Sequence, residues 1–280
     1  MNQPAILLET VACVACGADD ARFWARENGY EAVKCRRCGV VYVNPRPPLE
    51  LISEAARTGL HPTDEGHLNV KAKRSTAKIS HYEALVADAF HEELGAPLSW
   101  LDVGAGYGEL VEAVSGLVAP GSRVLGIEPM AAKAAVAEAR NLPVSRTPLS
   151  EVTDRFDVVS LINVFSHIPH FRDFGAQVRK RLRPGGHLFL ETGNGGDLDR
   201  RADYPDRLYL PDHLVFIGVE QMRRLLDGMG FDLVATRALG LSNLARLKNV
   251  AKTMVDGRWQ LLAALNSPFR TVFYKAKART

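Results

Sequence analysis

Short apolar runs and stretches with helical spacing alternate through the middle of the chain. The apolar runs cover residues 100–103, 123–127, 156–162 and 187–192. Runs this short, with little polar alternation, are typical of central strands in a parallel sheet. A stretch with helical spacing, 109–114, follows the first run. The pattern predicts an α/β domain built on a doubly wound sheet.

The flanks of this region predict further elements. Residues 76–94 carry an apolar stripe at helical spacing and predict a helix. Residues 231–237 and 271–277 alternate and are rich in β-formers, so they predict two more strands. Residues 61–67 show no hydrophobic period, and we expect a mobile lid there.

Three glycines follow the first predicted strand, in the segment LDVGAGYG at 101–108. Glycine lets the backbone turn sharply and approach a ligand where a Cβ would collide. In the dinucleotide fingerprint G-x-G-x-x-G the third glycine would fall at Glu109, but here it is Gly108. An NAD-type turn, or a turn that binds nothing, is the alternative to a site for another nucleoside cofactor.

Two carboxylates accompany the glycines. Glu128 follows the second predicted strand, where a carboxylate can accept hydrogen bonds from both hydroxyls of a ribose. Asp102 precedes the first glycine and is placed to hold an ammonium group. S-adenosylmethionine has no pyrophosphate to neutralise but has a methionine ammonium, so the pair favours this cofactor.

Four segments in order along the chain, LDVGAGYG, GIEP, FDVVSLINVFSHIPH and LRPGGHLFLETGN, resemble the motifs of class I S-adenosylmethionine-dependent methyltransferases. The resemblance covers most of residues 98–236 and implies a Rossmann-like seven-stranded sheet whose sixth and seventh strands are antiparallel. It also implies that the 76–94 helix covers the cofactor. The cofactor-binding residues that it implies are Asp102, Gly104, Ala105, Gly106, Tyr107, Gly108, Glu128, Pro129, Leu149 and Asn163.

The sequence departs from the family pattern at two places. One broad branch of the family often has a glutamate where Ser166 stands, and an acidic residue is common near Thr147 and Pro148. The contacts that those acidic groups make to the cofactor have no counterpart here.

The chain has four cysteines, arranged as Cys13-x-x-Cys16 and Cys35-x-x-Cys38. Each pair ends in Cys-Gly, and this spacing matches a four-cysteine zinc ribbon with a closed, structural metal site. Two disulfides or a redox pair are the alternatives. We expect neither, because the apolar stretch at 6–8 is too short for a secretory signal and cytosolic disulfides are rare.

The predicted organisation has three parts. Residues 1–48 form the zinc ribbon, ending in a stiff exit at 44–48. Residues 49–97 form a linker and helical cap, and residues 98–280 form the methyltransferase domain. A basic amphipathic helical insertion is predicted at about 241–268. We expect the ribbon to close over the substrate side of the catalytic domain, with an RNA or protein contact as the alternative.

Charge and hydropathy limit the classes of partner that we expect for this chain. The net charge is only +3 and no apolar run reaches membrane-spanning length, so we expect a cytoplasmic enzyme. Acidic and basic residues balance in the ribbon, and nucleic acid is not the expected partner. From Arg237 onward, the sequence has nine Lys or Arg residues and a single acidic residue, Asp256. That excess indicates a solvated helix face or attraction to an anionic acceptor, nucleotide-linked or lipid-linked.

A hydroxyl acceptor benefits from a general base, and histidine is the usual base near neutral pH. His213, within Leu-Pro-Asp-His, is the first candidate; His167 and His170 follow. Each could instead anchor a loop. Tyr209 and Asn194 are candidates for orienting the acceptor.

The sequence thus predicts a methyltransferase with S-adenosylmethionine and structural zinc as cofactors. Its expected acceptor is a small molecule, and the expected site of methylation is a hydroxyl of a sugar, glycoconjugate or secondary metabolite. Ribosomal RNA methylation and a non-catalytic zinc-ribbon binding protein are the alternatives. The sequence predicts no oligomeric state.

Overall fold

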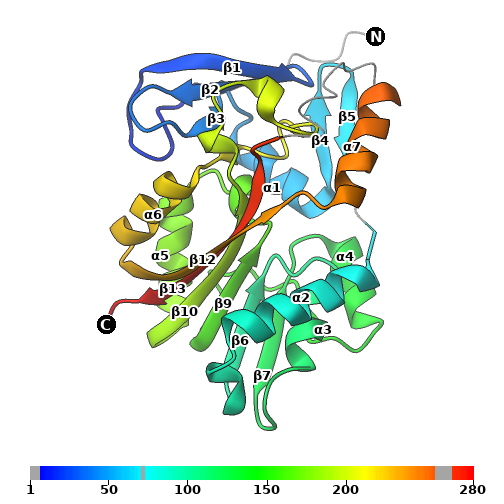
Figure 1. Cartoon of the computed structure of the whole chain (residues 1–280), viewed down its shortest axis with the longest axis vertical. Coiled ribbons are helices and arrows are strands. Elements are labelled where there is room, and N and C mark those ends of the chain that lie inside the picture. Colours follow the sequence, from blue (N-terminus) through cyan, green and yellow to red (C-terminus); the bar gives the residue numbers. More distant parts are fainter. Residues whose placement is uncertain (1–6, 71–72, 256–266) are drawn as a thin grey trace.

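A computed structural model describes residues 7–70, 73–255 and 267–280. Its main feature is a seven-stranded sheet with two faces covered by helices (Figure 1). From edge to edge the strands are β12 (Phe231–Gly240), β13 (Arg270–Ala278), β10 (Leu182–Gly193), β9 (Phe156–Ile162), β6 (Ser99–Val103), β7 (Arg123–Ile127) and β8 (Val144–Ser145).

The strand directions agree with the predicted fold. β10, β9, β6, β7 and β8 pair in parallel, in the order that crossover helices allow. β13 runs antiparallel to both β10 and β12, so the last two strands are antiparallel to each other as expected. The sequence-based prediction of a seven-stranded Rossmann-like sheet is confirmed.

Neighbouring residues on the central strands contribute to two different hydrophobic cores, because successive side chains of a strand point to opposite faces of the sheet. Trp100 belongs to the core that includes side chains of α2 (Thr76–Ala89) and α3 (Glu109–Ser115), whereas Leu101 belongs to the core that includes side chains of α5 (Phe171–Arg181) and α6 (Val219–Gly228). α4 (Ala131–Glu138) lies against β8. Helices on both faces therefore bury both sides of the parallel strands.

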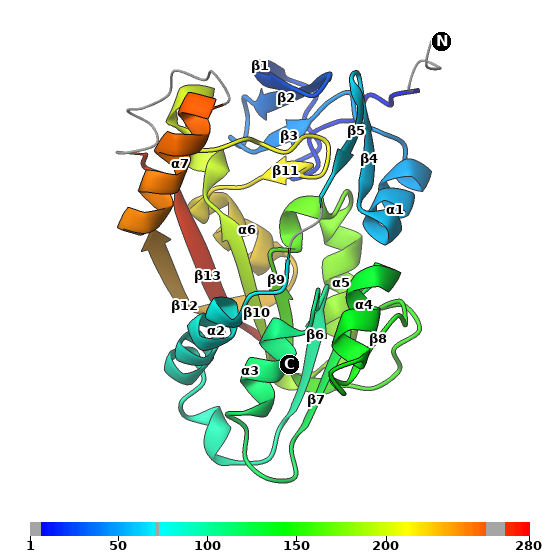
Figure 2. The same cartoon turned by 90° about the vertical axis from the view of Figure 1, so that its right-hand side faces the viewer.

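A second sheet covers one end of the first (Figures 1 and 2). It contains β1 (Ala21–Glu27), β2 (Tyr30–Cys35) and β3 (Val41–Val43), which form the predicted ribbon. Its fourth strand, β11 (Val215–Phe216), comes from far along the chain and pairs antiparallel with β3. The ribbon sheet therefore includes a strand from beyond the predicted boundary at residue 48, and its buried side chains join the core of the α5–α6 face.

The segment expected as a mobile lid, which showed no hydrophobic period, folds as a regular hairpin. β4 (Leu60–Thr63) and β5 (Gly66–Asn69) pair antiparallel around a two-residue turn. They follow α1 (Leu49–Thr58), and both elements lie at the ribbon end of the molecule (Figure 2). Pairing with a partner strand, which a search for local periodicity does not detect, orders the segment.

The remaining elements differ in detail from the prediction. The helix expected over 76–94 ends at Ala89. α7 (Asn243–Val255) forms as predicted, but Leu244 and Leu247 are exposed rather than packed. The rest of that insertion, 256–266, lies outside the described residues. Single-turn helices among the described residues are η1 (Glu93–Gly95), η2 (Phe165–His167), η3 (Gly195–Asp197) and η4 (Arg201–Asp203).

Within the described ranges, no helix combines the length and the apolar character that crossing a membrane requires.

Candidate functional site: one cavity with a glycine loop and a histidine cluster

A cavity of about 880 Å³ lies where the parallel strands end. Its floor includes the carboxyl ends of β6, β7 and β9, the place where ligands bind in open α/β sheets. Its other walls come from α1, from the β4–β5 hairpin and from the segment before β11. The main sheet and the elements around the ribbon therefore line one shared cavity.

The glycine loop forms the first part of the floor. Gly104 has φ +76°, and a Cβ there would lie 2.4 Å from a methyl of Val164. The amides of Gly104 and Ala105 both donate to the carbonyl of Ile127, at 2.8 and 3.0 Å. The loop is thus pulled toward the end of β7, and only glycine fits at its first turn.

Glu128 ties the glycine loop to the next strand. Its carboxylate accepts hydrogen bonds from the Gly106 amide at 2.7 Å and from the Met130 amide at 2.9 Å. The side chain is almost fully buried yet lines the cavity. Since each carboxylate oxygen has two lone pairs, both oxygens keep the capacity to accept from a ligand.

Asp102 is a buried carboxyl at the end of β6. Burial raises its pKa to about 7, the Ser160 hydroxyl lowers it by donating at 2.6 Å, and the charges of Glu128 and Glu109 raise it further. Three carboxyl groups around one part of the cavity leave an excess of negative charge. A cationic group would relieve that repulsion.

The structure brings nearly all of the predicted cofactor residues to this cavity. The lining includes Asp102, Gly104, Ala105, Gly106, Tyr107, Glu128, Pro129, Leu149 and Asn163. Gly108 does not line it; its positive φ and the nearby Leu142 side chain make it a turn residue of the loop. Thr147 and Pro148 also face the cavity, without the acidic group that the family often has there.

The other part of the cavity contains a cluster of histidines around one carboxylate. Asp212 Oδ1 lies 3.1 Å from Nδ1 of His167 and 3.1 Å from Nε2 of His61. His167 Nδ1 is also 2.9 Å from the main-chain oxygen of Asp212. The ring of His213 lies 4.9 Å from that of His167, centroid to centroid.

The cluster separates the pKa values of its two central histidines. Burial opposes charge on His167, but the adjacent Asp212 carboxylate raises its pKa above the usual value. Burial and the neighbouring His167 lower the pKa of His213 to about 4. Burial would raise the pKa of Asp212, yet His167 and His61 hold it well below its usual range. At neutral pH, Asp212 is therefore ionised and His213 is neutral.

Sequence reasoning missed Asp212 and His61 as members of this cluster. Asp212 precedes His213 in the chain, and this adjacency could have identified it as a site residue. No sequence pattern could have identified His61, because only the fold brings β4 to the cavity. Tyr209 lines the cavity as expected. His170 contacts Arg46, and Asn194 bonds to the Arg270 amide; neither lines the cavity.

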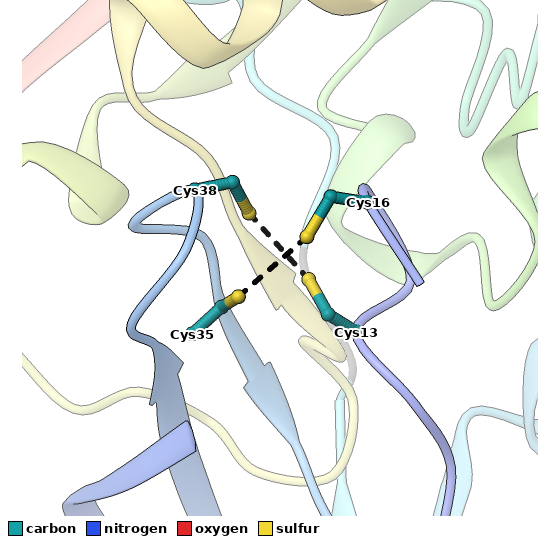
Figure 3. A group of neighbouring side chains, drawn as sticks. All are labelled: Cys13, Cys16, Cys35 and Cys38. Atoms are coloured by element: carbon teal, nitrogen blue, oxygen red, sulfur yellow. Dashed lines mark hydrogen bonds between the residues drawn. The ribbon is translucent and has the colours of Figure 1, made fainter. Parts of the chain in front are cut away.

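The four cysteines form a separate group in the ribbon (Figure 3). The sulfurs of Cys13 and Cys38 are 3.5 Å apart and those of Cys16 and Cys35 are 3.6 Å apart. A disulfide needs about 2.05 Å, so all four remain thiols. Tetrahedral coordination at a metal–sulfur distance of about 2.3 Å places sulfurs roughly 3.8 Å apart. The four cysteines therefore fit a metal ion.

The electrostatics of the thiols agree with that fit. The hydrogen bond with Cys13 and burial raise the pKa of Cys38 far above its usual value. Four thiols this close cannot all ionise to thiolates without a cation among them. A divalent ion at the centre of the group would remove this cost and keep every sulfur ionised.

Comparison with known proteins agrees with the fold and with the glycine loop. A family described as "Methyltransferase domain" matches residues 76–236, which is more than half of the chain. Ubiquinone biosynthesis O-methyltransferase from Rhizobium rhizogenes is 28% identical over 177 residues, covering 58% of this chain and 71% of the relative.

Solved structures with the same fold are more distant in sequence. Coclaurine N-methyltransferase, bound to N-methylheliamine and SAH, has a TM-score of 0.53 at 15% identity, covering 74% of this chain and 75% of that one. The cyclase SpnF has a TM-score of 0.53 at 18% identity, with 82% and 93% covered. Likeness at this level concerns the fold. Together with the family match over most of the catalytic domain, it leads to one conclusion: the chain belongs to the class I S-adenosylmethionine-dependent methyltransferases.

Proposed function

We propose that this methyltransferase methylates a hydroxyl group of a small molecule, such as a sugar, a glycoconjugate or a secondary metabolite. One observation carries the proposal: a single cavity contains the cofactor motif at one end and a carboxylate-bound histidine at the other. A donor and an acceptor held in one cavity can meet with their reacting atoms aligned, which is a large part of catalysis in group transfer.

At the cofactor end, the buried carboxylates have distinct roles in the proposal. Asp102 holds the methionine ammonium, because burial and the nearby Glu128 and Glu109 carboxylates raise its pKa to about 7, and a cation bound beside it would stabilise its ionised form. Glu128 receives the ribose hydroxyls on the lone pairs that Gly106 and Met130 leave free. S-adenosylmethionine supplies an activated methyl group on a cationic sulfur. The same surplus of negative charge suits that sulfonium.

At the acceptor end, the contacts favour His167 as the general base. Its Nδ1 faces two oxygens of Asp212, so in the neutral ring the proton resides on Nδ1. Nε2 is then the proton acceptor, and the Asp212 carboxylate stabilises the charge that develops. A raised pKa makes His167 a stronger base than His213. This assignment reverses the order that the sequence suggested.

His213 and Tyr209 orient the acceptor in this proposal. A histidine with a pKa of about 4 stays neutral and offers a hydrogen-bond acceptor or donor without charge. Tyr209 lies on the same side, with its ring 6.1 Å from that of His213, centroid to centroid. Two polar rings beside the base fix the direction of a hydroxyl.

The nature of the acceptor follows from the cavity and from the relatives. The Rhizobium relative is by its name an O-methyltransferase, which supports oxygen as the atom methylated. Arg57, Lys133 and Arg146 line the cavity outside the carboxylate cluster. They give a negatively charged acceptor, nucleotide-linked or lipid-linked, a favourable place for its anionic group.

We further propose that the ion at the four cysteines is zinc and that its role is structural. A set of four thiolates with no water position is typical of structural zinc. The cysteines lie outside the lining of the cavity, so the ion does not touch the acceptor. It stabilises the ribbon strands that pair with β11.

The test of the proposed function uses S-adenosylmethionine with a labelled methyl group. The protein is incubated with host-cell extract separated into small-molecule, glycolipid, RNA and protein fractions. We expect label in the small-molecule or glycolipid fraction, bound through an alkali-stable ether. Label in RNA or protein alone would contradict the proposal.

A further inference from the structure

The loop that carries the acceptor-side residues is fastened to the ribbon at its first residues. The two oxygens of the Glu27 carboxylate accept hydrogen bonds from consecutive amides, Leu208 at 2.9 Å and Tyr209 at 2.7 Å. Glu27 ends β1 and is separated from this loop by most of the chain. A carboxylate that accepts two main-chain N–H bonds through separate oxygens fixes the backbone direction of the loop.

The next residue of the ribbon makes the following contact. Asn28 donates from Nδ2 to the carbonyl of Leu210 at 2.7 Å. Its φ of +56° is left-handed, a conformation that asparagine tolerates and that aims its side chain across to the loop. Glu27 and Asn28 thus hold three successive residues, 208–210, which only Pro211 separates from Asp212.

Further contacts hold the far side of the loop and a neighbouring element. The amide of Val43 donates to the Leu214 carbonyl at 2.9 Å, and β3 then pairs with β11. The Tyr30 hydroxyl donates to the Pro62 carbonyl at 2.9 Å, next to His61. The ribbon therefore holds both ends of the loop and the hairpin that supplies His61.

Glu27 is itself held in place rather than free to rotate. Arg201 lies 3.5 Å from its Oε2, and both side chains are less than one-fifth exposed. Arg201 also donates to the carbonyls of Tyr204 and Asp206, within the segment that leads into the loop. The carboxylate is therefore oriented by a cation on one side and bound to the loop on the other.

We propose that Glu27 and Asn28 are positioning residues for methyl transfer: they hold the 208–214 loop so that Tyr209, Asp212 and His213 face the acceptor. The proposal rests on the proposed function of that loop. It gives the ribbon a role in catalysis beyond covering the cavity, exerted at the turn of its hairpin. Because Asp212 orients His167, a displaced loop also misplaces the base.

The test compares three full-length variants. Glu27→Gln keeps the shape of the side chain but turns one acceptor oxygen into an NH₂ group that faces an N–H donor. Asn28→Gly removes the bond to Leu210 and keeps the left-handed backbone without strain. Glu31→Gln is the matched control: it makes the same chemical change in the same hairpin, and its carboxylate forms no hydrogen bond or ion pair with another described residue.

Two readouts are needed. Hydrogen exchange, followed by mass spectrometry of the 204–214 peptide, reports whether the loop is held. Initial rates of label transfer to the accepting extract fraction, over a range of S-adenosylmethionine concentrations, separate kcat from KM. We expect exchange to become at least tenfold faster in Glu27→Gln and kcat to fall at least tenfold, with KM for S-adenosylmethionine within twofold of wild type. Asn28→Gly should change both in the same direction, and Glu31→Gln neither.

Two results would overturn the proposal that Glu27 and Asn28 position the 208–214 loop for methyl transfer. One is exchange in Glu27→Gln and Asn28→Gly that matches Glu31→Gln. The other is faster exchange with an unchanged kcat, which would make the contacts structural only. A wild-type protein that transfers no label would contradict the proposed function instead, and the exchange result would still decide whether Glu27 holds the loop.

Discussion

At the proposed cofactor end of the cavity, the main side chains come from one stretch of chain between Asp102 and Met130. At the proposed acceptor end, they come from several segments far apart in sequence. β6, the glycine loop and β7 are consecutive in the chain. The hydrogen bond from the Gly106 amide to Glu128 therefore joins two residues of the same βαβ unit. His61, His167 and Asp212 meet only through the docking of the β4–β5 hairpin and the ribbon. The difference is one between a local site and an assembled one.

That difference has a physical consequence. A local site depends on short-range hydrogen bonds inside the main sheet and should survive damage elsewhere. An assembled site depends on every contact that places its segments, including Glu27 with Leu208 and β3 with β11. We therefore expect changes at a distance to affect methyl transfer much more than cofactor binding.

The largest expected effect comes from removing a ligand of the proposed zinc site in the ribbon. Cys35→Ser should reduce bound zinc from one ion per chain to none and unfold the ribbon, since structural zinc contributes on the order of 10 kcal/mol to such modules. Methyl transfer should be lost, while cofactor affinity, measured by calorimetry, should fall much less. Metal analysis and circular dichroism check the change. A variant that keeps its zinc and its ribbon would disprove the four-cysteine assignment.

The next largest effect distinguishes the two candidate bases at the proposed acceptor end. His167→Ala should lower kcat by at least a factor of about 100, the usual contribution of a general base. Affinity for S-adenosylmethionine should stay within twofold. His91→Ala, an exposed histidine at the end of α2, is the matched control and should behave as wild type. If His167→Ala retained full activity while His213→Ala lost it, the base would be His213, as the sequence first suggested.

At the cofactor end, Glu128→Ala should weaken binding of S-adenosylmethionine at least tenfold. The variant loses the proposed ribose contact and also the bonds that join Gly106 to Met130. Calorimetric titration measures the affinity, with Glu138→Ala, an exposed carboxylate on α4, as the control. Unchanged affinity in Glu128→Ala would remove Glu128 from the cofactor site.

The smallest expected effect is a pH dependence. Burial, opposed by Ser160 and reinforced by Glu128 and Glu109, raises the pKa of Asp102 to about 7. A cationic ligand binds the ionised form, so affinity should rise with pH, by roughly fivefold between pH 6 and pH 7, as the ionised fraction grows. Asp102→Asn should bind more weakly and lose this dependence. A wild-type affinity that falls over this interval would contradict the role of Asp102.

The same contrast explains what the sequence could predict. Gly104, Asp102 and Glu128 lie at strand ends within one βαβ unit, so spacing alone placed them at the cavity. The grouping of the four cysteines was predictable in the same way, because two residues between a pair of cysteines is the spacing typical of a metal-binding turn. Hydrophobic periodicity predicted six of the seven strands, whereas the seven-stranded sheet was implied by the family resemblance and the two-residue β8 was not predicted.

Partners separated by a large part of the chain were beyond that reasoning. No spacing links Glu27 to Tyr209 or His61 to Asp212, because tertiary docking creates both contacts. The β4–β5 hairpin was missed for a related reason: its order comes from strand pairing rather than from an apolar stripe. His170 was indistinguishable from His167 in the sequence, and only the fold turns it toward Arg46.

The most direct test of the two-ended cavity compares Glu128→Ala with Asp212→Asn in one experiment that measures cofactor affinity and label transfer. For Glu128→Ala, we predict weak affinity and transfer that recovers as the concentration of S-adenosylmethionine is raised. For Asp212→Asn, we predict near wild-type affinity and transfer that no concentration restores. If both variants instead lost affinity and transfer together, the cavity would not contain two separable ends and the account would be wrong.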